Sequence, residues 1–211
     1  IFSGYYCDNI YVNNTIIGNS SKKYIFQDPH HPYFVGNIFL GNVYAEKFDI
    51  NDEKDDAVFK YNVMPLFVAS SVSGAGLYKP DFTNIVSDYY IDRIKGELDF
   101  FSEIDDISDV KDRSADIATL FEGTYDPSTG LFTPVLAYNG GFTPTVALKS
   151  DRLPDGTSIR FPLSETTVTA DQRGVKRLEQ TCMGAYELVC SPAVVELADT
   201  IAGLKKASSG K

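Results

Sequence analysis

The chain has 211 residues, of which 43% are hydrophobic and 13% aromatic, and its 29 acidic against 19 basic side chains give a formal net charge of −10. This composition excludes disordered, collagen-like and disulfide-dense chains, and the length is enough to bury a sizeable core. The acidic balance excludes nucleic acid as a partner, because phosphate backbones are bound by clustered Lys and Arg. No apolar run reaches the length of a membrane-spanning helix, so the chain is not expected to be transmembrane itself.

A short motif recurs in the first third of the chain. Asn-Thr-Ile-Ile-Gly-Asn at 14–19 returns 23 residues later as Asn-Ile-Phe-Leu-Gly-Asn at 37–42, and a weaker third copy begins at Asn62. Repeats with periods of about 20 to 50 residues are typical of solenoids, propellers and arrays. Asn and Gly accept left-handed backbone geometry, and stacked Asn side chains can bond to one another. The motif therefore predicts a parallel β-helix, and the alternative is chance recurrence in an Asn-rich surface segment.

In this β-helix we expect stacked coils over residues 1–75. The residues at the two ends of the motif are predicted to occupy equivalent, stacked turns: Asn14, Asn19, Asn37 and Asn42. The apolar residues between them are predicted to face inward and build a continuous core: Ile16, Ile17, Ile38 and Phe39.

Acidic side chains are concentrated between Asp49 and Asp116, and the Asn-Gly motif stops after its third copy. Apolar residues near helical spacing indicate a helix in this region: Val86, Tyr89, Tyr90, Ile94 and Leu98. We interpret residues 76–130 as an acidic, partly helical insertion. Calcium binding is an alternative use of the acidic runs, but no EF-hand spacing is present. A solvated acidic face is the simpler interpretation, and no metal or cofactor is expected.

Further features lie near the ends of the chain. It begins at Ile1 without an initiator Met or the layout of a signal peptide, so we expect a processed or truncated piece. Residues 191–211 begin with a Ser-Pro cap and carry an apolar face at helical spacing, which predicts a C-terminal helix followed by a flexible tail. Cys182 and Cys190 are close enough in sequence for a disulfide in an oxidising compartment, and two buried free thiols are the alternative.

Three sequence elements follow one another in the last third of the chain. They are Leu-Ala-Tyr-Asn-Gly-Gly-Phe-Thr-Pro-Thr-Val-Ala-Leu at 136–148, Asp-Gln-Arg-Gly-Val-Lys-Arg at 171–177 and Cys-Met-Gly-Ala-Tyr-Glu at 182–187. In this order they resemble the C-terminal end of bacterial surface proteins of the choice-of-anchor Q type, in particular the Bacteroidetes variants. The stretch 153–162 departs from the family pattern, and Cys-Met at 182–183 stands where Asp-Ile is usual.

The resemblance implies a mainly β protein, a right-handed parallel β-helix (solenoid) whose terminal coils lie at 131–190. It also implies a place at the bacterial cell surface or outside the cell, associated with the outer membrane. The turn at 171–174 offers an Arg that can pair with a carboxylate such as Glu187. We interpret the residues of these elements as structural rather than catalytic: Asn139, Gly140, Gly141, Asp171, Arg173, Gly174, Arg177, Gly184 and Glu187.

The sequence offers few residue combinations that could form a catalytic site. The two histidines, His30 and His31, are adjacent in a proline-bounded turn, and there is neither a Gly-x-Ser-x-Gly elbow nor a phosphate-binding loop. No catalytic residue is therefore assigned. The first hypothesis is a noncatalytic surface protein that acts in adhesion or in an outer-membrane assembly by binding a glycan or another envelope protein. Its candidate contacts are aromatic: Tyr5, Tyr6, Tyr11 and Tyr44.

The alternative hypothesis is a carbohydrate-active enzyme, either a polysaccharide lyase or a glycoside hydrolase. Such an enzyme needs two carboxylates, or a base beside charge-neutralising groups, projecting from neighbouring coils on the outer strand face. The motif strands instead offer Asn, Tyr and Phe, which suit stacking on sugars better than cleaving them.

Overall fold

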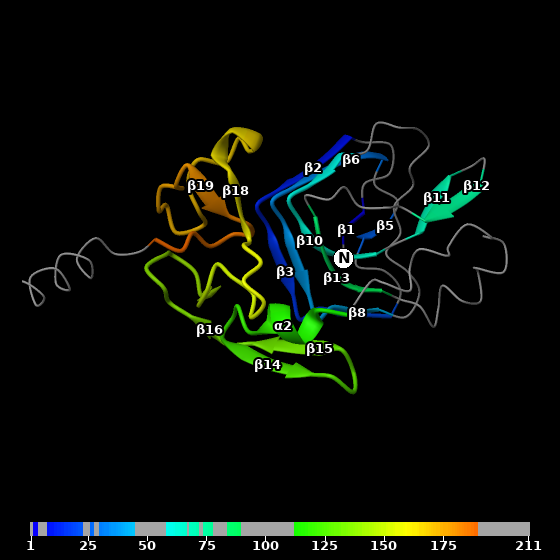
Figure 1. Cartoon of the computed structure of the whole chain (residues 1–211), viewed down its shortest axis with the longest axis horizontal. Coiled ribbons are helices and arrows are strands. Elements are labelled where there is room, and N and C mark those ends of the chain that lie inside the picture. Colours follow the sequence, from blue (N-terminus) through cyan, green and yellow to red (C-terminus); the bar gives the residue numbers. More distant parts are fainter. Residues whose placement is uncertain are drawn as a thin grey trace, which may run out of the picture.

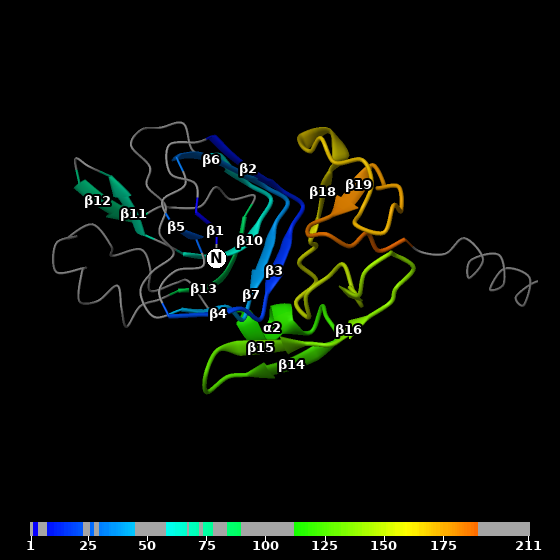
Figure 2. The same cartoon turned by 180° about the vertical axis from the view of Figure 1, so that it is seen from behind.

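The computed structural model describes residues 2–3, 8–22, 26–27, 30–44, 58–66, 68–71, 74–77, 84–89 and 112–189 of the chain. Over these residues the protein is mainly β, as predicted, with one short α-helix, α2 (Ser114–Ala118), and one 3-10 helix, η1 (Leu163–Glu165) (Figures 1 and 2). The helix predicted at 191–211 and most of the acidic stretch lie outside the described residues. Within the described part, no helix is long and apolar enough to span a membrane.

Parallel strand pairing organises the first part of the chain. The larger sheet has the order β13-β10-β7-β3, formed by Ile85–Tyr89, Val63–Leu66, Ile38–Leu40 and Thr15–Ile17. A second sheet has the order β2-β6-β9, formed by Asp8–Val12, His30–Val35 and Val58–Lys60. Two smaller parallel pairs join β4 (Ser20–Ser21) to β8 (Val43–Tyr44) and β1 (Phe2–Ser3) to β5 (Phe26–Gln27).

The chain therefore runs through the same succession of sheets more than once. We call β2, β3 and β4 the first repeat, and β6, β7 and β8 the second. The third repeat contains β9 and β10, and the fourth contains β13. After the third repeat the chain forms an antiparallel hairpin of β11 (Val68–Ser71) and β12 (Gly74–Leu77) before it returns to the larger sheet.

Each of the first three repeats bends at a residue with left-handed backbone, where the second sheet leads into the larger one. These residues are Asn13, Gly36 and Tyr61, with φ of 54°, 69° and 54°. Gly adopts this conformation freely and Asn often, whereas a bulky residue such as Tyr does so at a cost. The Tyr61 ring stacks on Phe161 with centroids 5.2 Å apart, and this contact offsets the cost.

An asparagine follows each bend, and these side chains form a hydrogen-bonded ladder. The backbone N–H and the Nδ2 of Asn14 donate to Oδ1 of Asn37 at 2.9 and 3.1 Å. Asn37 donates in the same way to Asn62, and Asn62 donates to Asn84. Asn14 and Asn37 thus occupy equivalent positions, as the 23-residue spacing predicts.

A second, shorter ladder stands at the next bend. Nδ2 of Asn19 lies 2.8 Å from Oδ1 of Asn42, and the backbone N–H of Asn19 donates to the same oxygen. Gly18 and Gly41 precede these two asparagines with φ of 65° and 56°. The Gly-Asn pair of the motif therefore supplies both the bend and its ladder side chain.

The first ladder extends further than the sequence motif indicates. Asn84 is its fourth member, and β13, which follows it, pairs in parallel with β10. The helix predicted from the spacing of Val86 and Tyr89 is therefore wrong at these residues, which belong to a strand. Helical spacing of apolar residues is a local signal, and pairing with a neighbouring strand overrides it. The range 76–130 accordingly contains a strand of the parallel sheet as well as α2.

Side chains of the larger sheet pack on both of its faces. Ile16 pairs in register with Phe39, whose ring lies 6.0 Å from that of Phe34 in the second sheet, so these residues face inward. Ile17 and Ile38 point the opposite way, because successive residues of a strand alternate between faces. Both belong to the packing on the outer face of the sheet. The prediction that all the apolar motif residues face inward is therefore wrong for Ile17 and Ile38.

Residues 112–189 form what we call the C-terminal lobe, and its strands pair antiparallel. The pairs are β14 (Gly123–Asp126) with β15 (Leu131–Pro134), β16 (Leu136–Ala137) with β17 (Thr145–Val146), and β18 (Arg160–Pro162) with β19 (Gln180–Cys182). The stacked coils expected at 131–190 are thus not what residues 131–189 form. Parallel neighbours need a crossover of a dozen or more residues, whereas a short turn such as 127–130 returns the chain antiparallel beside itself.

The C-terminal lobe covers the outer face of the larger sheet (Figure 1). Phe132 and Phe161 of the lobe belong to one buried cluster with Ile38 and Val63 of the sheet. Both faces of the sheet are therefore buried, and so are all three residues of β7. A continuous apolar run such as Ile-Phe-Leu is typical of a parallel strand that is covered on both sides.

Candidate functional site

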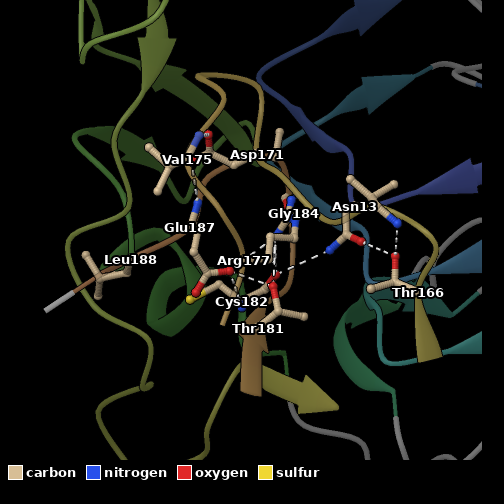
Figure 3. A network of polar contacts seen from close by, with 12 residues as sticks. Asn13, Thr166, Asp171, Val175, Arg177, Thr181, Cys182, Gly184, Glu187 and Leu188 are labelled. Atoms are coloured by element: carbon tan, nitrogen blue, oxygen red, sulfur yellow. Dashed lines mark hydrogen bonds and ion pairs between the residues drawn. The ribbon is translucent and has the colours of Figure 1, made fainter. Parts of the chain in front are cut away.

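The second and third C-terminal sequence elements meet in a buried network of charged side chains (Figure 3). Asp171 and Arg177 come from the element at 171–177, and Glu187 ends the element at 182–187. Arg160 joins them from β18. Glu187 is fully buried and Arg177 and Asp171 nearly so. Charges are buried in this way only where they are paired and hydrogen-bonded, so each partner of this network has to be accounted for.

Glu187 lies between two guanidinium groups. Its Oε1 accepts from Nη1 of Arg160 at 3.0 Å, and its Oε2 lies 3.4 Å from Nη1 of Arg177. The same Oε2 also accepts from the Thr181 hydroxyl and from the backbone N–H of Cys182 at 3.1 Å. Every partner of this carboxylate therefore belongs to β18, β19 or the segment between them.

Arg177 ties the last segment of the lobe together through main-chain oxygens. Its Nη2 donates to the carbonyl of Gly184 at 2.7 Å and its Nη1 to that of Cys182 at 3.0 Å. Burial lowers the pKa of Arg177, while the nearby Glu187 and Asp171 carboxylates oppose that shift. Since the ordinary pKa of Arg lies far above neutral, the side chain stays charged and acts as a fixed donor.

Asp171 closes the turn that begins at its own position. Its carboxylate accepts from the backbone N–H groups of Arg173, Val175 and Glu187 at 2.8, 3.0 and 3.0 Å. Burial raises the pKa of Asp171, but these hydrogen bonds and the Arg173 side chain outweigh it and hold the pKa below its ordinary value. Gly174, with φ of 83°, allows the tight return of the chain.

Arg173 bridges three parts of the lobe. It pairs with Asp171 at 2.6 Å, donates to the carbonyl of Glu187 at 2.7 Å and stacks over the Tyr186 ring at 3.5 Å from its centroid. The sequence predicts that the Arg of this turn pairs with the Glu187 carboxylate. Arg173 instead donates to the main-chain carbonyl of Glu187, and the carboxylate is bound by Arg160 and Arg177. Arg160 belongs to no sequence element of the resemblance, so nothing in the motif pointed to it.

The Asn-Gly-Gly element forms the loop of the β16–β17 hairpin. Nδ2 of Asn139 donates to the carbonyl and to the hydroxyl of Thr145, both at 3.0 Å, and this closes the loop. A Cβ on Gly141 would lie 3.3 Å from Cγ of Arg173, whereas one on Gly140 would meet nothing within 4 Å. Asn139 and Gly141 are therefore structural, and Gly140 supplies a φ of 95°.

The segment at 182–187 also fastens the C-terminal lobe to the repeats. The N–H of Gly184 donates to the carbonyl of Gly36 at 2.6 Å, and the N–H of Ala185 donates to the Thr15 hydroxyl at 2.9 Å. A Cβ on Gly184 would lie 2.5 Å from that hydroxyl, so this close approach requires glycine. The amide of Asn13 adds a bond to the carbonyl of Cys182 at 3.3 Å.

This network offers no reactive group to a substrate. Its two carboxylates are buried and held by arginines, and burial raises the pKa of the Cys182 thiol to about 12. Cys182 is a free thiol, while Cys7 and Cys190 lie outside the described residues. Among the residues that the structure describes, no group of three His, Cys, Asp or Glu side chains could hold a metal ion. The network holds the last segment of the lobe in place, and main-chain groups of that segment bond to the repeats.

Of the four aromatic contacts predicted from the sequence, Tyr11 alone has its side chain in the described part of the chain. The Tyr11 ring is half-buried and stacks on Phe34 with centroids 4.6 Å apart, and burial raises its pKa. Tyr44 lies in β8, but its side chain lies outside the described part, as do Tyr5 and Tyr6 altogether.

Other aromatic side chains are exposed on the C-terminal lobe. Tyr138 is 75% exposed and Phe142 completely so, on either side of the Asn-Gly-Gly turn. The sequence interpretation missed both, although an uncharged segment with two aromatics around a glycine turn was visible there. Comparison of the chain with protein-family models, with curated proteins and with solved structures finds no match.

Proposed function

We propose that this chain forms part of a right-handed parallel β-helix in a noncatalytic bacterial surface protein that works by binding a glycan or another envelope protein. The parallel pairing of successive repeats supports the scaffold, as do the asparagine ladder and the recurring left-handed bends. The likeness of the C-terminal elements to choice-of-anchor Q proteins supports the surface location. Stacked repeats build extended surfaces that suit recognition.

One observation carries the choice of binding over catalysis. The outer face of the larger sheet, where a β-helix enzyme would hold its catalytic groups, lies under the C-terminal lobe. Its outward residues are apolar, among them Ile38, Leu40 and Val63. Sugar cleavage needs carboxylates that reach the substrate, and this face offers a packing surface for the lobe instead.

Two buried carboxylates of the C-terminal lobe support the same choice. Asp171 and Glu187 stand close together, since the N–H of Glu187 donates to the Asp171 carboxylate. Both are more than nine-tenths buried and both bind arginine side chains. A catalytic pair must meet the glycosidic oxygen and the anomeric carbon, and buried carboxylates of this kind cannot.

Incubation of the purified chain with plant, animal and bacterial polysaccharides tests the proposal. We expect retention of at least one polysaccharide without release of soluble sugar, or capture of an envelope protein from the producing cell. Sugar release that disappears when a single acidic residue in 49–116 is neutralised would establish the lyase or hydrolase instead. A Glu179→Gln variant is the matched control, because Glu179 is an exposed carboxylate in the C-terminal lobe.

The location is tested on intact producing cells. Brief protease treatment should remove the chain from the cell surface while a cytoplasmic marker protein remains whole. Full protection of the chain until the cells are lysed would contradict the surface location.

A further inference from the structure

We infer that the β16–β17 hairpin, residues 135–146, is a contact site for a neutral saccharide. This inference rests on the proposed binding function and deepens it, because it names the surface and the chemical class of the ligand.

Exposed apolar side chains are concentrated on this hairpin. Of the eight large hydrophobic residues that are exposed in the described part of the chain, four lie between positions 135 and 142: Val135, Leu136, Tyr138 and Phe142. Their exposed fractions are 56%, 62%, 75% and 103%. Single exposed hydrophobic residues are ordinary, but a cluster on one short hairpin marks a recognition surface.

The hairpin presents these side chains on a fixed base. Leu136 pairs with Val146 and Ala137 with Thr145, and Thr145 itself is buried. The Asn139 amide closes the loop through Thr145. A ligand that binds a surface already held in place pays less ordering entropy than one that has to organise a mobile loop.

The buried charge network also holds the loop of this hairpin in place. Nη1 of Arg173 reaches the carbonyl of Asn139 at 3.4 Å, while Asp171 and the Tyr186 ring hold the same arginine in place. The loop that carries Tyr138 and Phe142 is therefore bonded to the buried charge network of the lobe.

The charge pattern selects the ligand class. No charged residue occurs between Asp126 and Lys149, in a chain whose formal net charge is −10. An acidic polysaccharide would find no cation on this hairpin, and it would be repelled by the rest of the molecule. The groups that remain are aromatic rings beside hydroxyl groups, such as that of the exposed Thr143. Rings that stack on the C–H face of a sugar, together with neutral hydrogen-bonding groups, fit an uncharged saccharide.

An array of neutral and anionic saccharides of plant, animal and bacterial origin, probed with the full chain, identifies a ligand, and calorimetry then measures its affinity. We expect a neutral saccharide to bind, and we expect Tyr138→Ala and Phe142→Ala each to weaken it at least about tenfold, which is the effect of losing a contact worth about 1.4 kcal/mol. Ile10→Ala is the matched control, because Ile10 is 72% exposed but lies in β2. The Ile10→Ala variant should bind the saccharide with the affinity of the unaltered chain. Tyr138 and Phe142 are exposed, so unchanged melting temperatures should show that both variants fold.

The outcomes separate the hairpin from the general proposal. Binding of a neutral saccharide that survives both hairpin substitutions would overturn the hairpin site and leave the binding function standing. Binding only of anionic saccharides would overturn the ligand class. If no saccharide binds and an envelope protein is captured in a way that depends on Phe142, the site is a protein contact and the saccharide inference is wrong. If nothing binds at all, the proposed function fails together with the inference.

Discussion

Glu187 shows how single residues hold the C-terminal lobe in shape. A buried ion pair gains little over well-packed apolar residues, because both charges lose their hydration. Removing one partner is costly, however, since the other charge then stays buried without compensation. Here one carboxylate compensates Arg160 and Arg177 at once and also accepts from the hydroxyl of Thr181 and the N–H of Cys182. The Glu187 carboxylate therefore holds four groups of the lobe in fixed positions.

Replacing Glu187 by Gln should strongly destabilise the protein. The amide keeps the shape of the side chain but leaves the buried Arg177 guanidinium without its paired carboxylate, and it leaves Arg160 with Asp151 as its remaining counter-charge. We expect the free energy of unfolding in urea to fall by about 3 kcal/mol. The exposed Glu179→Gln variant should unfold like the unaltered chain. Equal stabilities of the two variants would mean that the network contributes nothing.

Acid should weaken the lobe through Asp171. The folded-state pKa of this carboxyl is lowered, so its stabilisation is complete above the unfolded pKa of about 3.9 and is lost as the pH falls through the lower folded value. Urea unfolding followed from about pH 6 to about pH 3 should therefore show a smaller loss of stability for Asp171→Asn than for the unaltered chain. Identical pH profiles would contradict this assignment.

At the scale of elements, the asparagine ladder fixes how the repeats stack. The two central amides of the first ladder, Asn37 and Asn62, bond to the next asparagine and also to a carbonyl of the repeat before, as Nδ2 of Asn62 does to the carbonyl of Phe34 at 2.9 Å. A shift of one residue in register would break every one of these bonds and would also turn Phe39 outward. The ladder therefore fixes the register, while the apolar residues supply most of the favourable free energy.

Removing a central asparagine of the ladder should cost more than removing a peripheral one. Asn62→Ala leaves the buried donors of Asn37 and the carbonyl of Phe34 without their partner, so we expect a loss of about 2 to 4 kcal/mol in urea unfolding. Asn19 belongs to the second ladder and is only partly buried. Water can replace its bonds, so Asn19→Ala should cost about 1 kcal/mol or less. Similar losses at both positions would contradict a buried ladder.

The glycine bends also keep the repeats close to the lobe. A Cβ on Gly41 would lie 2.3 Å from the backbone nitrogen of Phe132, and Gly41 has a φ of 56°. Gly41→Ala should therefore lower the free energy of unfolding by at least about 3 kcal/mol, because it adds a collision with main chain to backbone strain.

Gly156→Ala is the control that isolates the strain. Gly156 also has a positive φ, of 87°, but an added Cβ there would meet nothing within 4 Å. Its substitution should cost only about 1 to 2 kcal/mol. If both variants lose the same amount in thermal or urea unfolding, the contact between Gly41 and the lobe is not tight.

In the molecule as a whole, the larger sheet contributes side chains to two hydrophobic cores, one on each of its faces. Its inner face packs Phe39 against Phe34, and its outer face packs Ile38 and Val63 against Phe161 of the C-terminal lobe. The repeats and the lobe thus share a layer of backbone. Separating them would expose apolar surface on both sides, and so we expect them to unfold together.

Ile38→Ala tests this shared layer. It removes a fully buried side chain from the outer core, and the expected cost is about 2 to 5 kcal/mol. Hydrogen exchange should show an equal loss of protection in β10 of the larger sheet and in β18 of the lobe. Loss confined to the lobe would mean that the repeats fold as an independent unit.

Features that recur along the chain were predictable from the amino-acid sequence. Asn14 and Asn37, like Asn19 and Asn42, could be matched because a ladder depends on the same residue returning at a regular spacing. The C-terminal elements also led to a structural interpretation of Asp171 and Glu187, because the open end of a solenoid needs a polar, well-bonded last coil. These signals are local or periodic, and both kinds are visible in a single sequence.

The face that each side chain meets depends on contacts between segments that are distant in the sequence. Ile38 and Phe39 are adjacent and equally apolar, and what separates them is that the C-terminal lobe lies on one side of β7. Likewise, β13 is a strand because β10 is there to pair with it. Glu187 binds Arg160, 27 positions away, because β18 and β19 pair antiparallel. Contacts between distant segments depend on where the whole chain folds back, and no spacing within the sequence records that.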